Sequence, residues 1–241
     1  MKQIVVGLGE VGSALLNILQ CDGYDPNKSF LTSDPHNQET YPFFWRDGQI
    51  YYGDYDVLHV AFPYFDKFEE TVREYQNLFH PKLTIIHSSV PVGTSREVEA
   101  VHSPIRGVHP YLEKGIRTFV KYFGGEKAED AAKIFSDLGI KTKVTDYSET
   151  TEAAKLWDTT QYGISILLNK EIYKFCKAKS IDFDIVYTDF NKTYNEGYTK
   201  LGMPHVVRPY LKHMEGKIGG HCVVPNAKLL QSWVAKLLDN G

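Results

Sequence analysis

The sequence predicts an α/β protein made of an N-terminal doubly wound parallel sheet and a smaller all-helical domain with one long central helix. Up to about residue 146, short apolar runs alternate with amphipathic helical stretches, as in proteins with parallel sheets. From Ser148 the alternation stops, and helical periodicity continues without interruption to about Lys179. We therefore place a sheet domain at 1–146 and a helical domain at 147–241.

The N-terminus carries the most specific motif of the sheet domain. An apolar run, Ile4 to Val6, leads into three glycines at G-x-G-x-x-G spacing, and apolar residues then recur at helical intervals. In such a strand, turn and helix, the glycines allow a tight turn, close approach of a pyrophosphate and close packing of the helix. The N–H groups of the first helical turn face the anion. We predict a Rossmann domain whose cofactor contacts are Gly7, Leu8, Gly9, Glu10, Val11 and Gly12.

An acidic residue at the end of the second strand would select the cofactor. Asp25 follows the glycine turn at about the expected distance, within the segment 20–25 that must hold this strand. Its carboxylate would accept hydrogen bonds from the ribose hydroxyls and repel a 2′-phosphate, so we expect NAD rather than NADP. Asp34 is the alternative acid, and a loop aspartate without this role is the other alternative.

The remaining elements of the sheet domain follow the same alternation. Strands are predicted at 49–52, 56–62, 83–87, 105–108, 118–123 and 141–144, and helices at 67–79 and 126–138. Ligands bind at the carboxyl ends of parallel strands. We therefore expect further cofactor contacts from Pro63, Ser88 and Val90. His109, at the end of the predicted strand 105–108, is a candidate acid or base because an imidazole titrates near neutral pH.

The helical stretch 148–179 is the main feature of the second domain. Glu152 is placed for a capping-box-like start. A broad apolar face contains Ala153, Leu156, Trp157, Thr160, Ile164, Leu167, Leu168 and Ile172. A helix of this length would span about 45 Å, which is typical of a domain backbone or a dimer interface. Shorter helices are predicted at 183–200 and 227–238.

Composition excludes several other classes of protein. The formal net charge is −3 and there is no basic tract, so neither nucleic acid nor a membrane is expected as a partner. The three scattered cysteines do not form a disulfide framework. The sequence enters its first strand directly, without room for a signal peptide, and we expect a cytoplasmic protein. His205, His213 and His221 lack the regular spacing of a metal site, so no metal is predicted.

Three motifs, in this order along the chain, resemble the UDP-glucose/GDP-mannose dehydrogenase family. They are GLGEVG at 7–12, SSVPVGT at 88–94 and GGHC at 219–222. The stretch 152–172 also looks like that family's central helix, with Lys155 at the position of its active-site lysine. The resemblance implies an NAD-dependent oxidation of an alcohol, followed in the family by oxidation to an acid through a cysteine thiohemiacetal.

The resemblance also implies roles for individual residues. Cys222 would be the nucleophile, Lys155 would stabilise developing charge on oxygen, and Ser89 would orient water or a base. Two catalytic positions depart from the family pattern: Thr159 stands where the family has an asparagine, and Asn226 where it has an aspartate. An amide cannot act as a carboxylate base, so these departures affect the hydrolytic second oxidation more than hydride transfer.

Family members continue past the cysteine motif into a domain that helps hold the sugar nucleotide, and by this comparison the chain is a short form. The expected substrate is a small polar alcohol or sugar-like molecule, unless a partner supplies the missing surface or the cofactor site serves another purpose. The long helix implies a homodimer with Tyr162, Ile166 or Tyr173 at the two-fold contact. The alternative to a dehydrogenase is a catalytically reduced nucleotide-binding module.

Overall fold

The structure is a computed structural model that describes residues 1–27, 29–31, 43–46, 49–52, 54–107, 110–218 and 222–240. The chain divides into two compact units, Met1–Lys155 and Leu156–Gly241, which are described separately. Asp34, His109 and His221, three residues considered from the sequence, lie outside the described residues.

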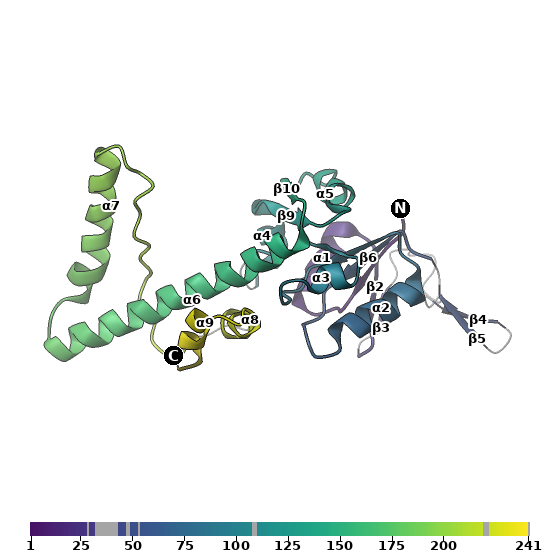
Figure 1. The fold of residues 1–241 in the computed structure, drawn as a ribbon, viewed down its shortest axis with the longest axis horizontal. Helices are drawn as coiled ribbons and strands as arrows, with labels where there is room; N and C mark the ends of the chain where they lie inside the picture. The colour runs from purple at the N-terminus through teal and green to yellow at the C-terminus, as the bar shows by residue number, and fades with distance from the viewer. Residues whose placement is uncertain are drawn as a thin grey trace. The chain divides into compact units, whose positions relative to one another are not determined.

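The first unit contains an eight-stranded sheet among its described residues, in the order β10-β9-β8-β7-β6-β1-β2-β3. The strands are β1 (Gln3–Val6), β2 (Asp22–Asp25), β3 (Ser29–Leu31), β6 (Val57–Val60), β7 (Leu83–Ile86), β8 (Val101–His102), β9 (Lys121–Gly124) and β10 (Thr142–Thr145). Pairing is parallel except between β2 and β3 and between β8 and β9. A separate hairpin, β4 (Phe43–Arg46) with β5 (Gln49–Tyr52), stands apart from this sheet (Figure 1).

In the described part of this unit the strands are accompanied by α1 (Glu10–Leu19), α2 (Phe68–Phe79), α3 (Thr94–Glu97), α4 (Leu112–Thr118), α5 (Ala128–Ser136) and the start of α6. Side chains alternate along β1, so that Val5 joins one buried cluster with α1, α4 and α5 while Ile4 and Val6 join another with α2. Because a strand points successive side chains to opposite faces, this alternation shows that both faces of the sheet are covered. The predicted doubly wound Rossmann-type sheet is therefore confirmed.

The second unit is helical, as predicted. Its elements are most of α6 (Ser148–Lys179), a π-helical turn η1 (Asp184–Asp189), α7 (Phe190–Lys200), α8 (Val223–Leu229), α9 (Trp233–Lys236) and a 3₁₀ turn η2 (Leu237–Asn240). An apolar cluster from the C-terminal helices packs on α6. A Cβ on Gly163 would lie 2.5 Å from Val223 and 2.8 Å from Leu238, so this glycine allows the close packing.

Several sequence predictions need correction. The strand expected at 105–108 is absent from residues 105–107, and the preceding residues Val101–His102 form β8 instead. The helix α4 and the strand β4 were not predicted. The helix expected at 227–238 is interrupted at Gln231, whose φ of 51° is left-handed, and α9 restarts with Ser232 as its N-cap.

The predicted apolar face of α6 is only partly buried in the chain. Trp157 is 45% exposed and Leu168 is 57% exposed, whereas the neighbouring Ile164 and Leu167 pack on the C-terminal cluster. Among the described residues, no helix has both the length and the apolar character needed to cross a membrane.

Candidate functional site

The glycine turn has the geometry that a phosphate-binding turn requires. Gly7 has a φ of +91°, and a Cβ there would lie 2.7 Å from the backbone nitrogen of Phe62. A Cβ on Gly12 would lie 1.9 Å from the Gly7 carbonyl oxygen, whereas a Cβ on Gly9 would meet nothing within 4 Å. The first and third glycines are thus fixed by the fold itself, and the middle one has open space beside it, where a ligand could approach the backbone.

The other residues of the turn contribute in different ways. Leu8 is 3% exposed and Val11 packs against the same buried cluster, so their side chains belong to the core and only their backbone could meet a ligand. Glu10 is exposed at the first position of α1.

Asp25 lies at the end of β2, beside the glycine turn. Its Oδ2 accepts a hydrogen bond from the Leu8 backbone N–H at 2.8 Å, and its Oδ1 accepts one from Asn27 at 2.9 Å. A carboxylate has about four acceptor positions, so these bonds leave capacity for ribose hydroxyls. The structure therefore brings Asp25 and the glycine turn together, as the sequence spacing indicates.

The ends of β6 and β7 meet through one hydrogen bond. The Ser88 hydroxyl donates to the Phe62 carbonyl at 2.5 Å, which joins the segment before Pro63 to the loop after β7. Pro63 is exposed, and Ser88 and Ser89 are half-buried. Val90 is fully buried in the cluster with α2, so its side chain serves packing.

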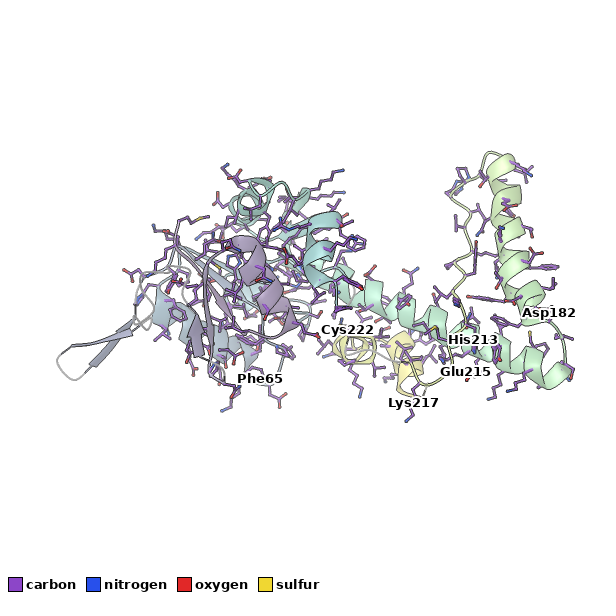
Figure 2. The ribbon with its side chains drawn as sticks, turned by 180° about the vertical axis from the view of Figure 1, so that it is seen from behind. Phe65, Asp182, His213, Glu215, Lys217 and Cys222 are labelled. Carbon is purple, nitrogen blue, oxygen red and sulfur yellow. The ribbon has the colours of Figure 1, made fainter. Side chains whose placement is uncertain are left out.

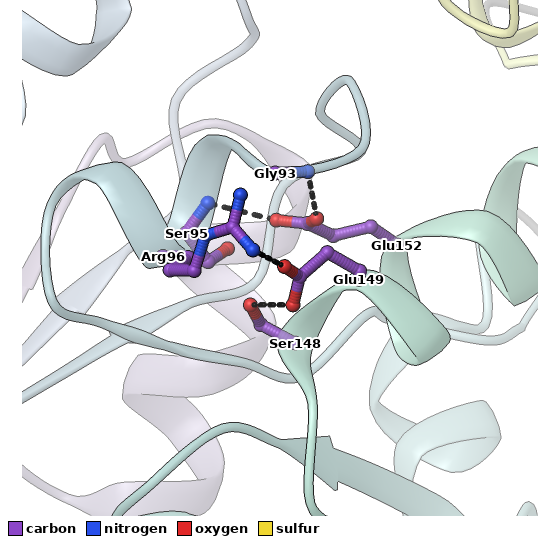
Figure 3. A network of polar contacts seen from close by, with 6 residues as sticks. All are labelled: Gly93, Ser95, Arg96, Ser148, Glu149 and Glu152. Atoms are coloured by element: carbon purple, nitrogen blue, oxygen red, sulfur yellow. Dashed lines mark hydrogen bonds and ion pairs between the residues drawn. The ribbon is translucent and has the colours of Figure 1, made fainter.

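The loop after β7 is attached to the start of α6 by a buried carboxylate. Glu152 is 0% exposed; its Oε2 accepts from the Gly93 N–H at 2.6 Å and its Oε1 from the Ser95 N–H at 2.8 Å (Figure 3). Burial raises the pKa of the Glu152 carboxyl, and the hydrogen bonds from Ser95 and Gly93 oppose that rise. Glu152 therefore binds another segment of the unit and does not act as the predicted capping box.

A second buried attachment runs through His102. Its Nε2 lies 3.1 Å from the Ser88 carbonyl oxygen and its Nδ1 lies 2.8 Å from the Thr151 hydroxyl. Burial is the largest cause that lowers the pKa of His102 to about 3. The hydrogen bond to Ser88 opposes this shift, and the charges of nearby lysines add to it, so the ring is neutral at pH 7. Because a carbonyl only accepts, Nε2 carries the proton and Nδ1 accepts from Thr151. Lys155, half-buried, follows Thr151 by one helical turn.

A chain of buried polar side chains crosses the interior of the sheet. Lys121 donates to the Ser103 carbonyl at 3.0 Å and lies 3.3 Å from His87 Nδ1. His87 Nε2 lies 3.0 Å from His59 Nδ1, and His59 Nε2 lies 2.9 Å from Gln3 Oε1. Burial is the largest cause of the pKa shifts in this chain of buried side chains. It lowers the pKa of His59 to about 3, and it lowers the pKa values of His87 and Lys121 well below their ordinary values.

The remaining predicted catalytic residues lie in the second unit. Asn226 is 6% exposed, and its Nδ2 donates to the Thr159 hydroxyl at 3.3 Å, so the two positions that depart from the family pattern are in contact. Thr159 in turn donates to the Leu156 carbonyl at 3.1 Å. Cys222 is exposed immediately before α8 (Figure 2), and its carbonyl accepts from the Asn226 N–H at 3.0 Å.

Sequence reasoning did not identify His102 or Lys121, and it gave Glu152 a different partner. The only available signal was the presence of polar residues within or beside apolar strand segments, because each partner lies far away in the sequence. Local spacing was sufficient for the glycine turn and Asp25 but not for these three residues.

No protein-family model and no curated protein sequence matches the chain. Among solved structures, a UDP-D-ManNAc dehydrogenase from Pyrococcus horikoshii is 16% identical with a TM-score of 0.73, over 100% of this chain and 68% of that one. A 3-hydroxyisobutyrate dehydrogenase from Mycobacterium tuberculosis is 14% identical with a TM-score of 0.65, over 100% of this chain and 92% of that one.

A third similar structure is the UDP-N-acetyl-mannosamine dehydrogenase Cap5O from Staphylococcus aureus. It is 21% identical with a TM-score of 0.60, and the alignment covers 100% of this chain and 68% of that one. The chain therefore shares the fold of sugar-nucleotide and hydroxy-acid dehydrogenases.

Proposed function

We propose that the chain is an NAD-dependent dehydrogenase that oxidises the hydroxyl group of a small polar or sugar-like substrate. The observation that carries the proposal is the glycine turn, which is sterically required at Gly7 and Gly12 and open at Gly9, with Asp25 bound to its backbone. The shared fold supports the same assignment, since similar structures are named as dehydrogenases of a sugar nucleotide and of hydroxyisobutyrate.

The residues of the turn fit a dinucleotide. The backbone N–H groups at the start of α1, a helix of 10 residues, would bind the pyrophosphate. Asp25 would accept hydrogen bonds from the adenosine ribose and disfavour a 2′-phosphate, which favours NAD over NADP. Pro63, Ser88 and the backbone of Val90 would continue the cofactor site along the ends of β6 and β7.

Bound NAD would supply the hydride acceptor for the oxidation. Lys155 would stabilise negative charge on the substrate oxygen as its proton leaves, and Ser89 would orient the substrate or a water molecule. Cys222 would trap an aldehyde product if the reaction proceeds to an acid. Asn226 would not act as a base in that second step, because its amide does not take up a proton near neutral pH.

The test is formation of NADH, followed at 340 nm, with a panel of hydroxy acids, polyols and sugar nucleotides. The wild-type chain should reduce NAD with at least one of them, and Lys155→Ala should lose that activity. Cys222→Ser should retain the first oxidation and lose any second one. Full activity of Lys155→Ala would contradict the role given to Lys155.

The second candidate function is a nucleotide-binding module without oxidation. The contact between Asn226 and Thr159 favours it, because the amide occupies the position of the family's carboxylate and is already engaged with a hydroxyl. This alternative predicts NADH binding, measured by titration calorimetry, without turnover of any substrate in the panel.

We further propose that the chain forms a homodimer through its helical unit. Three exposed apolar residues of α6, Trp157, Leu168 and Phe175, lie at spacings of eleven and seven, which places them on one face of a helix. In addition, α7 buries no residue within the chain. Of the predicted contact residues, Tyr162 is 54% exposed, whereas Ile166 packs on the C-terminal cluster and Tyr173 stacks on His213.

A further inference from the structure

The segment from Ser88 to Ser95 follows β7 and is held at both of its ends by side chains that reach the start of α6. We propose that Glu152 is the positioning residue that fixes this segment for the nicotinamide half of the cofactor. The inference rests on the proposed function, and it adds to it a residue that does not itself touch the substrate or the cofactor.

Both oxygens of the Glu152 carboxylate are engaged with the backbone of this segment. Each oxygen accepts one backbone N–H, at 2.6 Å from Gly93 and 2.8 Å from Ser95, and the side chain is fully buried. Hydrogen bonds to an ionised acceptor are stronger than neutral ones. Gly93 has a φ of +101°, in the region that favours glycine, so the backbone bends sharply at the point where the carboxylate binds.

The other end of the segment is held independently, through His102. The Ser88 carbonyl accepts from His102 Nε2 at 3.1 Å, and His102 Nδ1 lies 2.8 Å from the Thr151 hydroxyl. Thr151 and Glu152 are consecutive residues of α6, so both ends of the segment are attached to the same turn of one helix. Ser89, which is proposed to orient the substrate or a water molecule, lies between these two attachments.

Lys155 lies on the same helical turn as the residues that hold the segment. Residues three or four positions apart lie on neighbouring positions of one helical face. Lys155 is three residues after Glu152 and four after Thr151, so the turn that holds the segment also carries the proposed oxygen-binding lysine. Fixing the segment to this turn therefore sets the distance between Ser89 and Lys155, and a displacement of about 1 Å between such groups is sufficient to impair catalysis.

Glu149 provides a matched control on the same helix. Its carboxylate pairs with the Arg96 guanidinium at 2.5 Å and lies 3.2 Å from the Ser148 hydroxyl (Figure 3), and its side chain is 24% exposed. These partners are side chains, whereas Glu152 holds the backbone of the segment. Replacing either glutamate with glutamine removes one negative charge, but only Glu152→Gln should release the segment.

The experiment compares the affinities of NADH and ADP-ribose, which lacks the nicotinamide, for the wild type, Glu152→Gln and Glu149→Gln. A neutral glutamine offers one acceptor oxygen to two N–H groups, so both bonds lose their charge assistance and at least one is lost entirely, and NADH should bind about tenfold more weakly. ADP-ribose, which would contact only the glycine turn and Asp25, should keep its affinity. Glu149→Gln should change neither affinity.

Glu152→Asp keeps the charge on a shorter side chain, and it carries the test if Glu152→Gln does not fold. It should weaken NADH binding selectively, but less than the glutamine variant does. Equal changes for NADH and ADP-ribose, or no change for either, would overturn the positioning role. Failure of the wild type to bind either probe is a different result, because it would refute the proposed cofactor site itself.

Discussion

Acid should destabilise the sheet unit through its buried histidines, and His59 allows the effect to be isolated. His59 is 0% exposed and lies between His87 and Gln3. Burial, with a smaller contribution from the charge of Lys121, lowers the pKa of His59 from 6.5 to about 3. Between these two values only the unfolded chain takes up a proton at this site, so stability is present above pH 6.5 and is lost as the pH falls.

The magnitude follows from the linkage between proton uptake and folding. Between pH 7 and pH 5, a histidine that titrates at 6.5 when unfolded and stays neutral when folded lowers the free energy of unfolding by about 2 kcal/mol. His102, whose pKa is also lowered by burial to about 3, should add a similar loss. Replacing His59 with a residue that does not titrate should therefore reduce the pH dependence by about 2 kcal/mol.

The assay is urea unfolding at pH 7 and pH 5 for the wild type, His59→Gln and the control His80→Gln, followed by circular dichroism. His80 is 67% exposed in its pairing with Asp54, so it provides a control replacement of a histidine outside the buried chain. Carboxylates titrate in all three proteins and cancel in the comparison. If His59→Gln loses as much stability on acidification as the wild type, the buried histidine is not the cause and the reasoning is refuted.

Three further predictions concern the core, the glycine turn and the assembly. Burial lowers the pKa of the Lys121 amine well below its ordinary 10.5, so protonation favours the unfolded chain and the stability of the wild type should rise as the pH goes from 7 toward 10.5. Lys121→Met should remove this contribution, so its free energy of unfolding should rise less over the same range. An equal rise in both proteins, measured by urea unfolding, would count against it. Gly9→Ala should keep the melting temperature within a few degrees, because its Cβ meets nothing within 4 Å, yet it should weaken NADH binding. Gly12→Ala should lower both the melting temperature and the affinity for NADH, since its Cβ would lie 1.9 Å from the Gly7 carbonyl oxygen. Equal melting temperatures for the two variants would contradict the assigned roles. Sedimentation equilibrium should show that the wild type is a dimer. Trp157→Glu, on the exposed face of α6, should convert it to a monomer with an unchanged circular dichroism spectrum. A monomeric wild type at micromolar concentration would refute the proposed contact.

Local sequence patterns predicted the elements that depend on local information. The turn at Gly7 to Gly12 and the bounds of α6 follow from glycine spacing and helical periodicity, and both agree with the structure. The strand expected at 105–108 fails for a tertiary reason. A Cβ on Gly115 would lie 2.8 Å from the Cα of Gly107, so this segment packs against α4 at very close range and does not extend the sheet.

The candidate site was predictable to the same extent. The contact between Asp25 and the glycine turn was predictable because the two lie at a fixed distance along one strand and helix. Glu152 and His102 bind partners more than ten residues away in the sequence, and periodicity cannot indicate such contacts. Trp157 and Leu168 were predicted on the apolar face of the long helix, and both are exposed in the single chain, because pattern alone does not distinguish a core face from an interface.

The chain of Gln3, His59, His87 and Lys121 also has a direction. A neutral imidazole donates through one nitrogen and accepts through the other, so the tautomer of His87 determines that of His59. The tautomer of His59 then determines whether Gln3 presents its carbonyl oxygen or its NH2 group to the ring. His87 Nδ1 lies 3.0 Å from the Ser103 carbonyl oxygen, which only accepts, so Nδ1 carries the proton and the hydrogen bonds of both rings run in one direction. The nitrogen chemical shifts of His59 and His87 should therefore show the same tautomer in both rings. The orientation of the half-buried Gln3 amide should show which nitrogen of each ring carries the proton.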